Sequence, residues 1–251
     1  MNIIISGAMG AMGQVVASNA AARGITVVAG VDREASDRFP YPVFGSFADC
    51  GLSADAILDF SNPAALPGLL AFAQERRIPC VIATTGMDEA HQKMIADASK
   101  VIPIFFTFNM SLGVNLLCAL AQKAAQVLGE GFDIEIIEKH HNKKIDAPSG
   151  TAIMLANAVS EKTPYTPEYV YDRHAVRKRR EPNEIGIHSV RGGTIVGEHE
   201  VIFAGTDEVI TLSHGAYSKS VFAVGALKAA GFISVVGRSP GLYNMNDMIS
   251  F

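Results

Sequence analysis

Residues able to transfer a proton and to bind an anion gather in one segment in the middle of the chain, residues 138–152, which reads EKHHNKKIDAPSGTA. Histidine as a residue type can transfer protons near neutral pH, which makes His140 a candidate, and Lys144 brings a positive charge. We expect a strand over residues 132–137 before this segment and a helix over residues 152–159 after it. A helix start presents free backbone N–H groups and the positive end of the helix dipole, which suits a carboxylate or a phosphate. The segment therefore predicts an anionic substrate held beside a proton donor.

The same segment has a second interpretation. Paired histidines and lysines on a polar loop are commonly solvated, and Ser149 could serve only as the N-cap of the helix. Titratable clusters become site candidates when a cleft and shifted pKa values accompany them. The choice between the two interpretations therefore depends on the rest of the chain.

Composition excludes several classes of protein. The chain has 251 residues, of which 49% are hydrophobic, enough for the core of one large domain or two small ones. Its formal charge of −4 argues against a general nucleic-acid binder. Cys50, Cys80 and Cys118 are odd in number, widely spaced and set in apolar surroundings, which favours neither a disulfide framework nor a metal site. An apolar run directly after Met1 leaves no room for a signal peptide, and we expect no apolar run of membrane-spanning length. We expect a cytoplasmic protein with neither nucleic-acid nor membrane partners.

A glycine-rich turn follows the first apolar run. Residues 3–5 predict a buried strand and residues 14–22 a helix, with glycines between them in the order G-x-x-G-x-x-G. This pattern differs from the commoner G-x-G-x-x-G. It can still meet the same three requirements, which are a tight turn, close approach of the backbone to a pyrophosphate and close packing of the helix on the strand. A plain strand-to-helix turn is the alternative. The residues assigned to the cofactor here are Gly7, Ala8, Met9, Gly10, Ala11, Met12 and Gly13.

Asp32 directly follows the second apolar run, residues 25–31. It stands at the offset of ~20 residues at which dinucleotide-binding folds place a carboxylate on the adenosine ribose. Arg33 follows directly and could meet a 2′-phosphate. The pair therefore predicts a nicotinamide cofactor and leaves both NADH and NADPH open.

Strand-like and helix-like segments then alternate as far as residue 106, which is typical of a doubly wound parallel sheet of the Rossmann type. Ligands of such sheets bind beyond the carboxyl ends of the strands. Thr84 and Thr85 could hydrogen-bond a nicotinamide there, or could only cap the helix that follows. The cofactor candidates from these loops are Phe60, Ser61, Thr84, Thr85, Gly86, Phe108, Asn109 and Met110.

The second half of the chain predicts a smaller α+β domain. A helix over residues 111–128 precedes apolar runs at 132–137, 185–190, 194–204 and 208–214, joined by glycine-bearing turns, which predict a mostly antiparallel open sheet. The basic run 173–180 is interpreted as a solvated loop or as an electrostatic guide for an anionic substrate. A helix over 220–235 and the tail 241–251 should return to the first domain. The expected division is 1–109 with 220–251 for the dinucleotide, and 110–219 for substrate and oligomerisation.

Five stretches together resemble one family, 4-hydroxy-tetrahydrodipicolinate reductase, also called dihydrodipicolinate reductase. They are residues 7–13, 138–152, 185–193, 196–199 and 240–245, so the resemblance extends along the whole chain. It implies a two-domain subunit, a homotetramer formed through the open sheets, and reduction of a cyclic dicarboxylic imine by NADH or NADPH on the diaminopimelate route to lysine.

The resemblance also implies roles for individual residues. His140 would be the general acid, and Lys144 would pair with a substrate carboxylate. His141 and the backbone amides of Gly150 and Thr151 would bind the carboxylates as well. Lys219 stands where the family often has arginine, which keeps the charge near the cofactor but loses the planar fork.

Two rival functions stay open on the sequence. One is a different amino-acid dehydrogenase with the same two-domain plan, for example one acting on an aspartate-derived aldehyde, which would leave the histidine pair without a clear task. The other is a dinucleotide sensor without catalysis, against which the presence of both His140 and Lys144 speaks.

Overall fold

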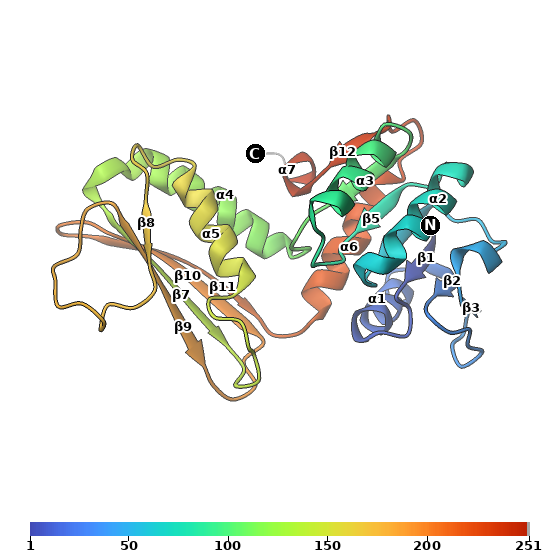
Figure 1. Ribbon diagram of the computed structural model, residues 1–251, viewed down its shortest axis with the longest axis horizontal. Coiled ribbons are helices and arrows are strands. Elements are labelled where there is room, and N and C mark those ends of the chain that lie inside the picture. The colour runs from blue at the N-terminus through green and yellow to red at the C-terminus, as the bar shows by residue number, and fades with distance from the viewer. Residues whose placement is uncertain (250–251) are drawn as a thin grey trace. The chain divides into compact units, whose positions relative to one another are not determined.

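The computed structural model describes residues 1–249, and the chain divides into two compact units (Figure 1). The first unit comprises Met1–Leu112 and Lys219–Phe251, of which the last two residues lie outside the described part. The second unit is Gly113–Ser218. The chain thus leaves the first unit once and returns to it.

A fully parallel sheet forms the centre of the first unit. Its order is β12-β6-β5-β4-β1-β2-β3, and every pair of neighbouring strands is parallel. The predicted doubly wound fold is therefore confirmed, and the tail adds an edge strand. The strands are β1 (Asn2–Ser6), β2 (Thr26–Val31), β3 (Val43–Phe44), β4 (Ala56–Asp59), β5 (Cys80–Ile82), β6 (Pro103–Phe106) and β12 (Gly241–Tyr243).

Helices cover both faces of this sheet, which explains the continuous apolar strands. Ile3 and Ile5 face one core cluster and Ile4 the other, and all three are fully buried. Residues of α1 and α6 join the first cluster, and residues of α2 and α3 join the second. The helical elements are α1 (Ala11–Ala21), η1 (Phe47–Asp49), η2 (Pro63–Ala65), α2 (Leu66–Arg76), α3 (Glu89–Ser99), α6 (Ser220–Ile233) and α7 (Met245–Met248).

The second unit is a five-stranded mixed sheet with two longer helices, α4 and α5, whose apolar side chains pack with it in a third core cluster. In the order β11-β10-β7-β9-β8, β10 is antiparallel to both its neighbours, whereas β7, β9 and β8 run parallel. The elements are α4 (Leu112–Leu128), η3 (Gly129–Gly131), β7 (Asp133–His140), α5 (Gly150–Ser160), β8 (Glu168–Val170), β9 (Glu184–Arg191), β10 (Gly197–Ala204) and β11 (Val209–Ala216).

Three details of this unit differ from the prediction. Strand β7 continues to His140, because Glu138 and His140 are buried on its covered face despite their polarity. Strands β9 and β10, predicted as neighbours across the turn at residues 191–193, lie on opposite sides of β7. The short strand β8 lies before the basic run, where no strand was predicted.

Helix α4 corrects the expectation that no segment approaches membrane-spanning length. With η3 it forms a run over Leu112–Gly131, long and apolar enough to cross a membrane by length and composition alone. Helices in the cores of soluble proteins pass the same test. Leu117, Ala121 and Ala125 of this helix lie in the third core cluster, so its apolar stripe has a partner within the unit.

Candidate functional site

Glycine is required at two positions of the first turn. Gly7 has φ +78, and a Cβ there would lie 2.6 Å from the carbonyl oxygen of Phe60. A Cβ on Gly13 would lie 2.2 Å from the carbonyl oxygen of Gly7, so only glycine lets α1 begin this close to the strand. Gly10 is the N-cap of α1, which has neither a side-chain cap nor an acidic residue in its first turn. The first N–H groups of α1 therefore keep their capacity to bind a phosphate.

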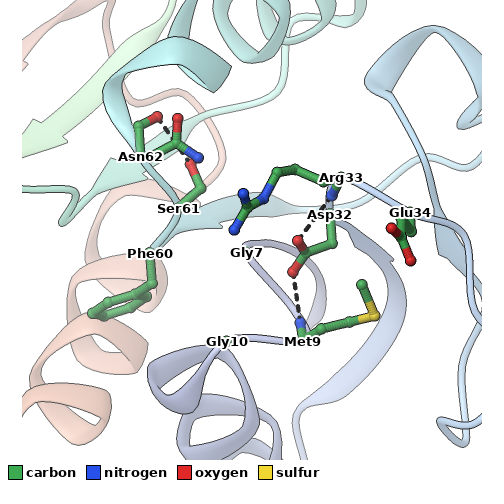
Figure 2. Close-up of a pocket in the computed structure, with 9 residues that line it drawn as sticks. All are labelled: Gly7, Met9, Gly10, Asp32, Arg33, Glu34, Phe60, Ser61 and Asn62. Atoms are coloured by element: carbon green, nitrogen blue, oxygen red, sulfur yellow. Dashed lines mark hydrogen bonds between the residues drawn. The ribbon is translucent and has the colours of Figure 1, made fainter.

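A cavity of about 480 Å³ lies beside this turn (Figure 2). Of the predicted cofactor residues, it brings together seven, and it adds Glu34 and Asn62, which sequence reasoning missed. Both follow predicted residues directly in the chain, and that adjacency was the only available signal. The lining residues are Gly7, Met9, Gly10, Asp32, Arg33, Glu34, Phe60, Ser61 and Asn62.

Asp32 is fixed at the end of β2 by two backbone donors. The Met9 N–H donates to Oδ2 and the Arg33 N–H donates to Oδ1, each at 2.8 Å. The carboxylate thereby stays over the glycine turn, with further lone pairs for a ribose hydroxyl. The exposed Arg33 side chain extends along the same cavity in Figure 2. These residues fit a dinucleotide, and the acidic and basic neighbours suit either form of it.

The remaining predicted cofactor residues do not line this cavity. Ala8 and Met110 are buried in the first core cluster, where Met12 also packs, while Ala11 and Gly13 belong to α1. Phe108 is 62% exposed, and Asn109 accepts a hydrogen bond from the Ser111 N–H at 2.8 Å. Lys219 is exposed immediately before α6.

The loop after β5 resolves one of the alternatives left open. Thr84 is buried, whereas Thr85 and Gly86 are exposed. The N-cap of α3 is Asp88, whose carboxylate accepts from the His91 N–H at 2.9 Å, so the interpretation of the threonines as helix caps is wrong.

Asp59 is a polar centre that sequence reasoning did not single out. Its side chain is buried at the end of β4, and Oδ1 accepts a hydrogen bond from the Ser61 hydroxyl at 2.5 Å. Burial raises the pKa of Asp59, although the neighbouring hydroxyls of Ser61, Thr84 and Ser6 oppose the shift. The carboxyl therefore holds the loop that follows β4 through Ser61.

The second unit holds the predicted proton donor in a network on the covered face of its sheet. Nδ1 of His140 lies 2.6 Å from Oε2 of Glu138, whose side chain is fully buried. Arg191, the register partner of His140 on β9, donates to both oxygens of the same carboxylate at 2.7 Å. The Ser149 N–H adds a fourth contact at 3.1 Å. Sequence reasoning missed Glu138 and Arg191, because only strand register brings them together.

Two groups of this network have strongly shifted pKa values, Glu138 and His199. Burial raises the pKa of Glu138, but hydrogen bonds from Arg191 and His140 outweigh that effect and hold it at about 2. His199 of β10 contacts the His140 ring edge-to-face at 5.2 Å between centroids. Burial, then the neighbouring His140, lowers the pKa of His199 to about 4. At neutral pH, Glu138 is therefore an anion and His199 is uncharged.

Helix α5 starts beside these groups. The hydroxyl of its N-cap, Ser149, accepts from the Ala152 N–H at 3.2 Å and lies 3.1 Å from Nε2 of His199. Gly150 is exposed, Thr151 is partly buried, and the first turn contains no acidic side chain. The positive end of the helix dipole is consequently not neutralised from within the helix.

The other two predicted substrate residues lie in the loop between β7 and α5. Lys144 forms an ion pair with Asp146 at 2.8 Å, and its backbone N–H donates to the His141 carbonyl at 3.1 Å. Nδ1 of His141 is buried without a hydrogen-bond partner. His140, His141, Lys144 and Gly150 thus belong to one continuous strand-loop-helix segment of the second unit.

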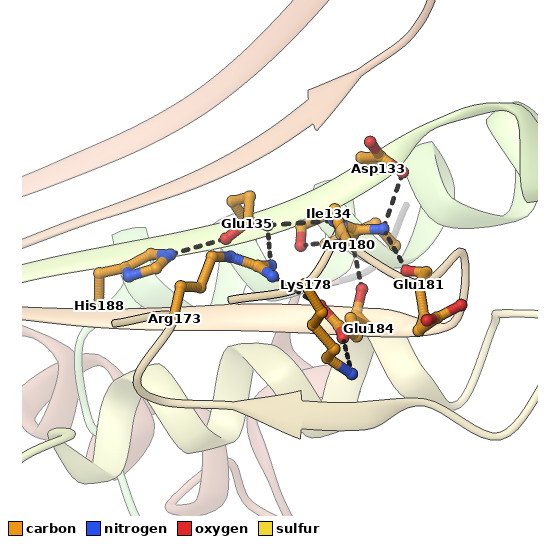
Figure 3. Close-up of polar contacts among 9 residues, drawn as sticks. All are labelled: Asp133, Ile134, Glu135, Arg173, Lys178, Arg180, Glu181, Glu184 and His188. Atoms are coloured by element: carbon orange, nitrogen blue, oxygen red, sulfur yellow. Dashed lines mark hydrogen bonds and ion pairs between the residues drawn. The ribbon is translucent and has the colours of Figure 1, made fainter. Parts of the chain in front are cut away.

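Residues 173–179 of the basic run are exposed, as expected for a solvated loop, and ion pairs also tie some of its side chains to the sheet (Figure 3). Arg173 and Lys178 pair with the fully buried Glu184 at 2.6 and 3.0 Å. These cations hold the pKa of Glu184 at about 2. Arg180 pairs with Asp133 at 2.7 Å and with Glu135 at 3.2 Å. Three of the basic side chains therefore attach this loop to carboxylates of the sheet.

Among residues 1–249, no group of three or more histidine, cysteine, aspartate or glutamate side chains is arranged to hold a metal ion.

Comparison with known proteins assigns both units to one family. Residues 1–110 match the family model described as dihydrodipicolinate reductase, N-terminus, and residues 113–249 match dihydrodipicolinate reductase, C-terminus. The chain belongs to the dihydrodipicolinate reductase family. It is therefore an NAD(P)-dependent oxidoreductase.

The similarity to known proteins extends over almost the whole chain. A 4-hydroxy-tetrahydrodipicolinate reductase of Caldanaerobacter subterraneus subsp. tengcongensis is 54% identical, over 99% of this chain and 98% of that protein. One of Clostridium novyi is 44% identical, over 98% and 97%. A solved structure, dipicolinate-bound dihydrodipicolinate reductase from Paenisporosarcina sp. TG-14, has a TM-score of 0.82 at 24% identity and covers 100% of this chain and 99% of that one. This last likeness supports the fold.

Proposed function

We propose that the enzyme reduces the cyclic dicarboxylic imine derived from 4-hydroxy-tetrahydrodipicolinate to tetrahydrodipicolinate, on the diaminopimelate route to lysine. The observation that carries this proposal is the buried Glu138–His140 pair beside the start of α5, in a chain of this family. The names of its relatives support the substrate, as does the dipicolinate bound to the Paenisporosarcina protein.

In the proposed reaction, His140 protonates the ring carbon of the substrate from Nε2, because Nδ1 is engaged by Glu138. Lys144 exchanges its pairing with Asp146 for a substrate carboxylate and stabilises charge that develops on the ring. His141, with its buried unpartnered nitrogen, and the start of α5 at Gly150 and Thr151 hold the carboxylates. A bound nicotinamide supplies the hydride.

The first unit would hold the dinucleotide. Its pyrophosphate would lie at the glycine turn and the start of α1, and its adenosine ribose at Asp32 and Arg33. Phe60, Ser61 and the loop at Thr84, Thr85 and Gly86 are proposed for the nicotinamide side, with Phe108, Asn109, Met110 and Lys219 as further contacts. Residues 1–109 and 220–251 would thus form the dinucleotide domain and residues 110–219 the substrate domain.

Oxidation of NADH and NADPH is the direct test, followed at the nicotinamide absorbance with the aldolase product of pyruvate and aspartate semialdehyde. We expect turnover that depends on both precursors. Turnover with aspartate semialdehyde alone would instead support an aldehyde dehydrogenase. Cofactor binding without any turnover would support a sensor.

The role of His140 is tested separately with His140→Gln. We expect kcat to fall by about 10²–10⁴-fold, the range for loss of a general acid, with little change in KM. His174→Gln on an exposed loop is the matched control. Unchanged turnover in His140→Gln would exclude His140 as the acid while leaving the reaction itself in place.

We also propose a cytoplasmic homotetramer formed through the open face of the second sheet. Exposed Val190 and Val209 on that sheet support an apolar contact between copies. Sedimentation analysis of the purified protein should give four times the mass of the chain. A monomer at micromolar concentration would refute the proposed assembly.

A further inference from the structure

One buried carboxylate connects three elements of the second unit. Glu138 contacts the His140 ring on its own strand, both terminal nitrogens of Arg191 on β9, and the backbone N–H of Ser149 at the start of α5. The side chain has no exposed surface, so it does not reach substrate itself. A buried anion with this many donors is costly to place unless each contact is kept.

The geometry points to Glu138 as a positioning residue that sets the tautomer of His140 and holds the substrate-binding start of α5. This inference rests on the proposed function, because it assigns a purpose to His140 and α5 in that reaction.

The tautomer follows from hydrogen-bond chemistry. An ionised carboxylate only accepts hydrogen bonds, so Nδ1 of His140 must carry a hydrogen when it lies 2.6 Å from Oε2. The proton that can be given away is then the one on Nε2. After transfer, His140 is left neutral with hydrogen on Nδ1, and Nε2 takes a new proton from water before the next turnover.

Space around Nε2 agrees with this assignment. The neighbour on that side is Gly197 of β10, where an added Cβ would lie only 3.1 Å from Nε2. The absence of a side chain at this position keeps the transferring nitrogen uncovered by β10. Glu138 therefore fixes the ring at Nδ1, whereas Gly197 leaves room beside Nε2.

The second role of Glu138 concerns the anion site. Its contact with the Ser149 N–H anchors the residue that caps α5. Arg191, held by the same carboxylate, also donates to the Asp146 carbonyl at 2.6 Å and so fastens the loop that carries Lys144. Loss of Glu138 should therefore weaken substrate binding as well as proton transfer.

Other charged and titratable groups lie on the elements around His140. Arg191 lies on β9 and His199 on β10, while Lys144 and Asp146 belong to the following loop. The Glu138 carboxylate contacts a ring nitrogen directly and so stabilises a positive charge on the ring. When the charge of Glu138 is removed, kcat should therefore begin to decline at a lower pH as the pH is raised.

The test is Glu138→Gln, which keeps the shape and removes the charge. Glu184→Gln is the matched control, because Glu184 is equally buried and paired with two cations in the same sheet but touches neither His140 nor α5. For Glu138→Gln we expect kcat to fall about 100-fold, KM for the dicarboxylate to rise about tenfold, and the alkaline limb of the kcat profile to shift to lower pH. For Glu184→Gln we expect kcat and its pH profile to stay as in the wild type.

A double variant separates this inference from the proposed function. In a His140→Gln background, Glu138→Gln should lower kcat little further, because it acts through His140, while its effect on KM should persist. Full activity of Glu138→Gln beside an impaired His140→Gln would overturn the positioning role alone. Full activity of His140→Gln would overturn the proposed acid instead.

Nitrogen NMR of the wild-type enzyme tests the tautomer even if a variant does not fold. Above the pH at which the ring loses its charge, we expect His140 to carry hydrogen on Nδ1 and a bare Nε2. Hydrogen on Nε2 in that state would refute the inference.

Discussion

Gly197→Ala offers a test of how tightly the fold positions the proton donor. The added methyl carbon would lie 3.1 Å from Nε2 of His140 and 3.5 Å from its Cδ2. A carbon in ordinary van der Waals contact stays beyond about 3.5 Å, so the ring must move by a few tenths of an ångström. Glu138 holds the opposite side of the ring at 2.6 Å, and His199 packs against its edge. The ring therefore cannot move without loss of one of these contacts.

The magnitude follows from these distances. A displacement of about 1 Å can cost about 10²-fold in rate, so a shift of a third to a half of that, with a methyl group over Nε2, should lower kcat by about tenfold. Overpacking should cost about 1–3 kcal/mol of stability, partly offset because alanine restricts the unfolded chain by about 0.4–1 kcal/mol. We expect the melting temperature to fall by only a few degrees.

Gly215→Ala on β11 is the matched control. Gly215 pairs with Glu198, the residue after Gly197, and a Cβ there would meet nothing nearer than the Tyr217 hydroxyl at 3.6 Å. Steady-state kinetics and thermal melting of both variants measure the effect. Wild-type kcat in Gly197→Ala, with the protein folded, would refute the argument that Nε2 is the transferring atom.

Further predictions concern cofactor choice and acid stability. Arg33→Ala should raise KM for NADPH about tenfold and leave KM for NADH nearly unchanged, because the exposed Arg33 side chain beside Asp32 would bind only the 2′-phosphate. Equal effects on both cofactors would contradict this. The free energy of unfolding should fall as the pH drops below about 6.5. In that range the unfolded chain binds a proton at His199, whereas in the folded chain burial keeps the pKa of His199 at about 4. Below about pH 4.5 the unfolded chain likewise protonates Glu138 and Glu184, whose folded pKa values are about 2, so stability continues to be lost toward that pH. Urea midpoints at pH 7, 5 and 3 should show this decline, and Glu184→Gln should flatten it between pH 5 and 3; a decline as steep as in the wild type would exclude Glu184 as a source.

The first unit could be predicted from the sequence because its information is local. Apolar runs such as residues 3–5 are buried on both faces, so each strand is visible without reference to its neighbours. Gly7 and Gly13 are required by contacts within their own turn. The edge strand β12 was predicted only as a returning tail, since its three residues acquire their pairing from β6.

The second unit was harder to predict because polar residues are buried in its strands. Glu138 and His140 look like loop residues until Arg191, far along the chain, pairs with Glu138, which in turn contacts His140. In the same way, the exposed residues Arg173 and Lys178 give no sign in the sequence that they pair with the buried Glu184. Hydrogen-bond partners at such separations leave no periodic pattern in the sequence.

The order of the strands also determines which histidine can carry the proton. Because β7 lies between β9 and β10, its covered face meets Arg191 from one side and His199 from the other. The carboxylate of Glu138 contacts His140, whereas His199 has only the Ser149 hydroxyl and a pKa of about 4. Two rings at 5.2 Å would repel each other if both were charged. With His199 kept neutral by burial, His140 is the ring of the two whose contact with a carboxylate suits it to hold a proton.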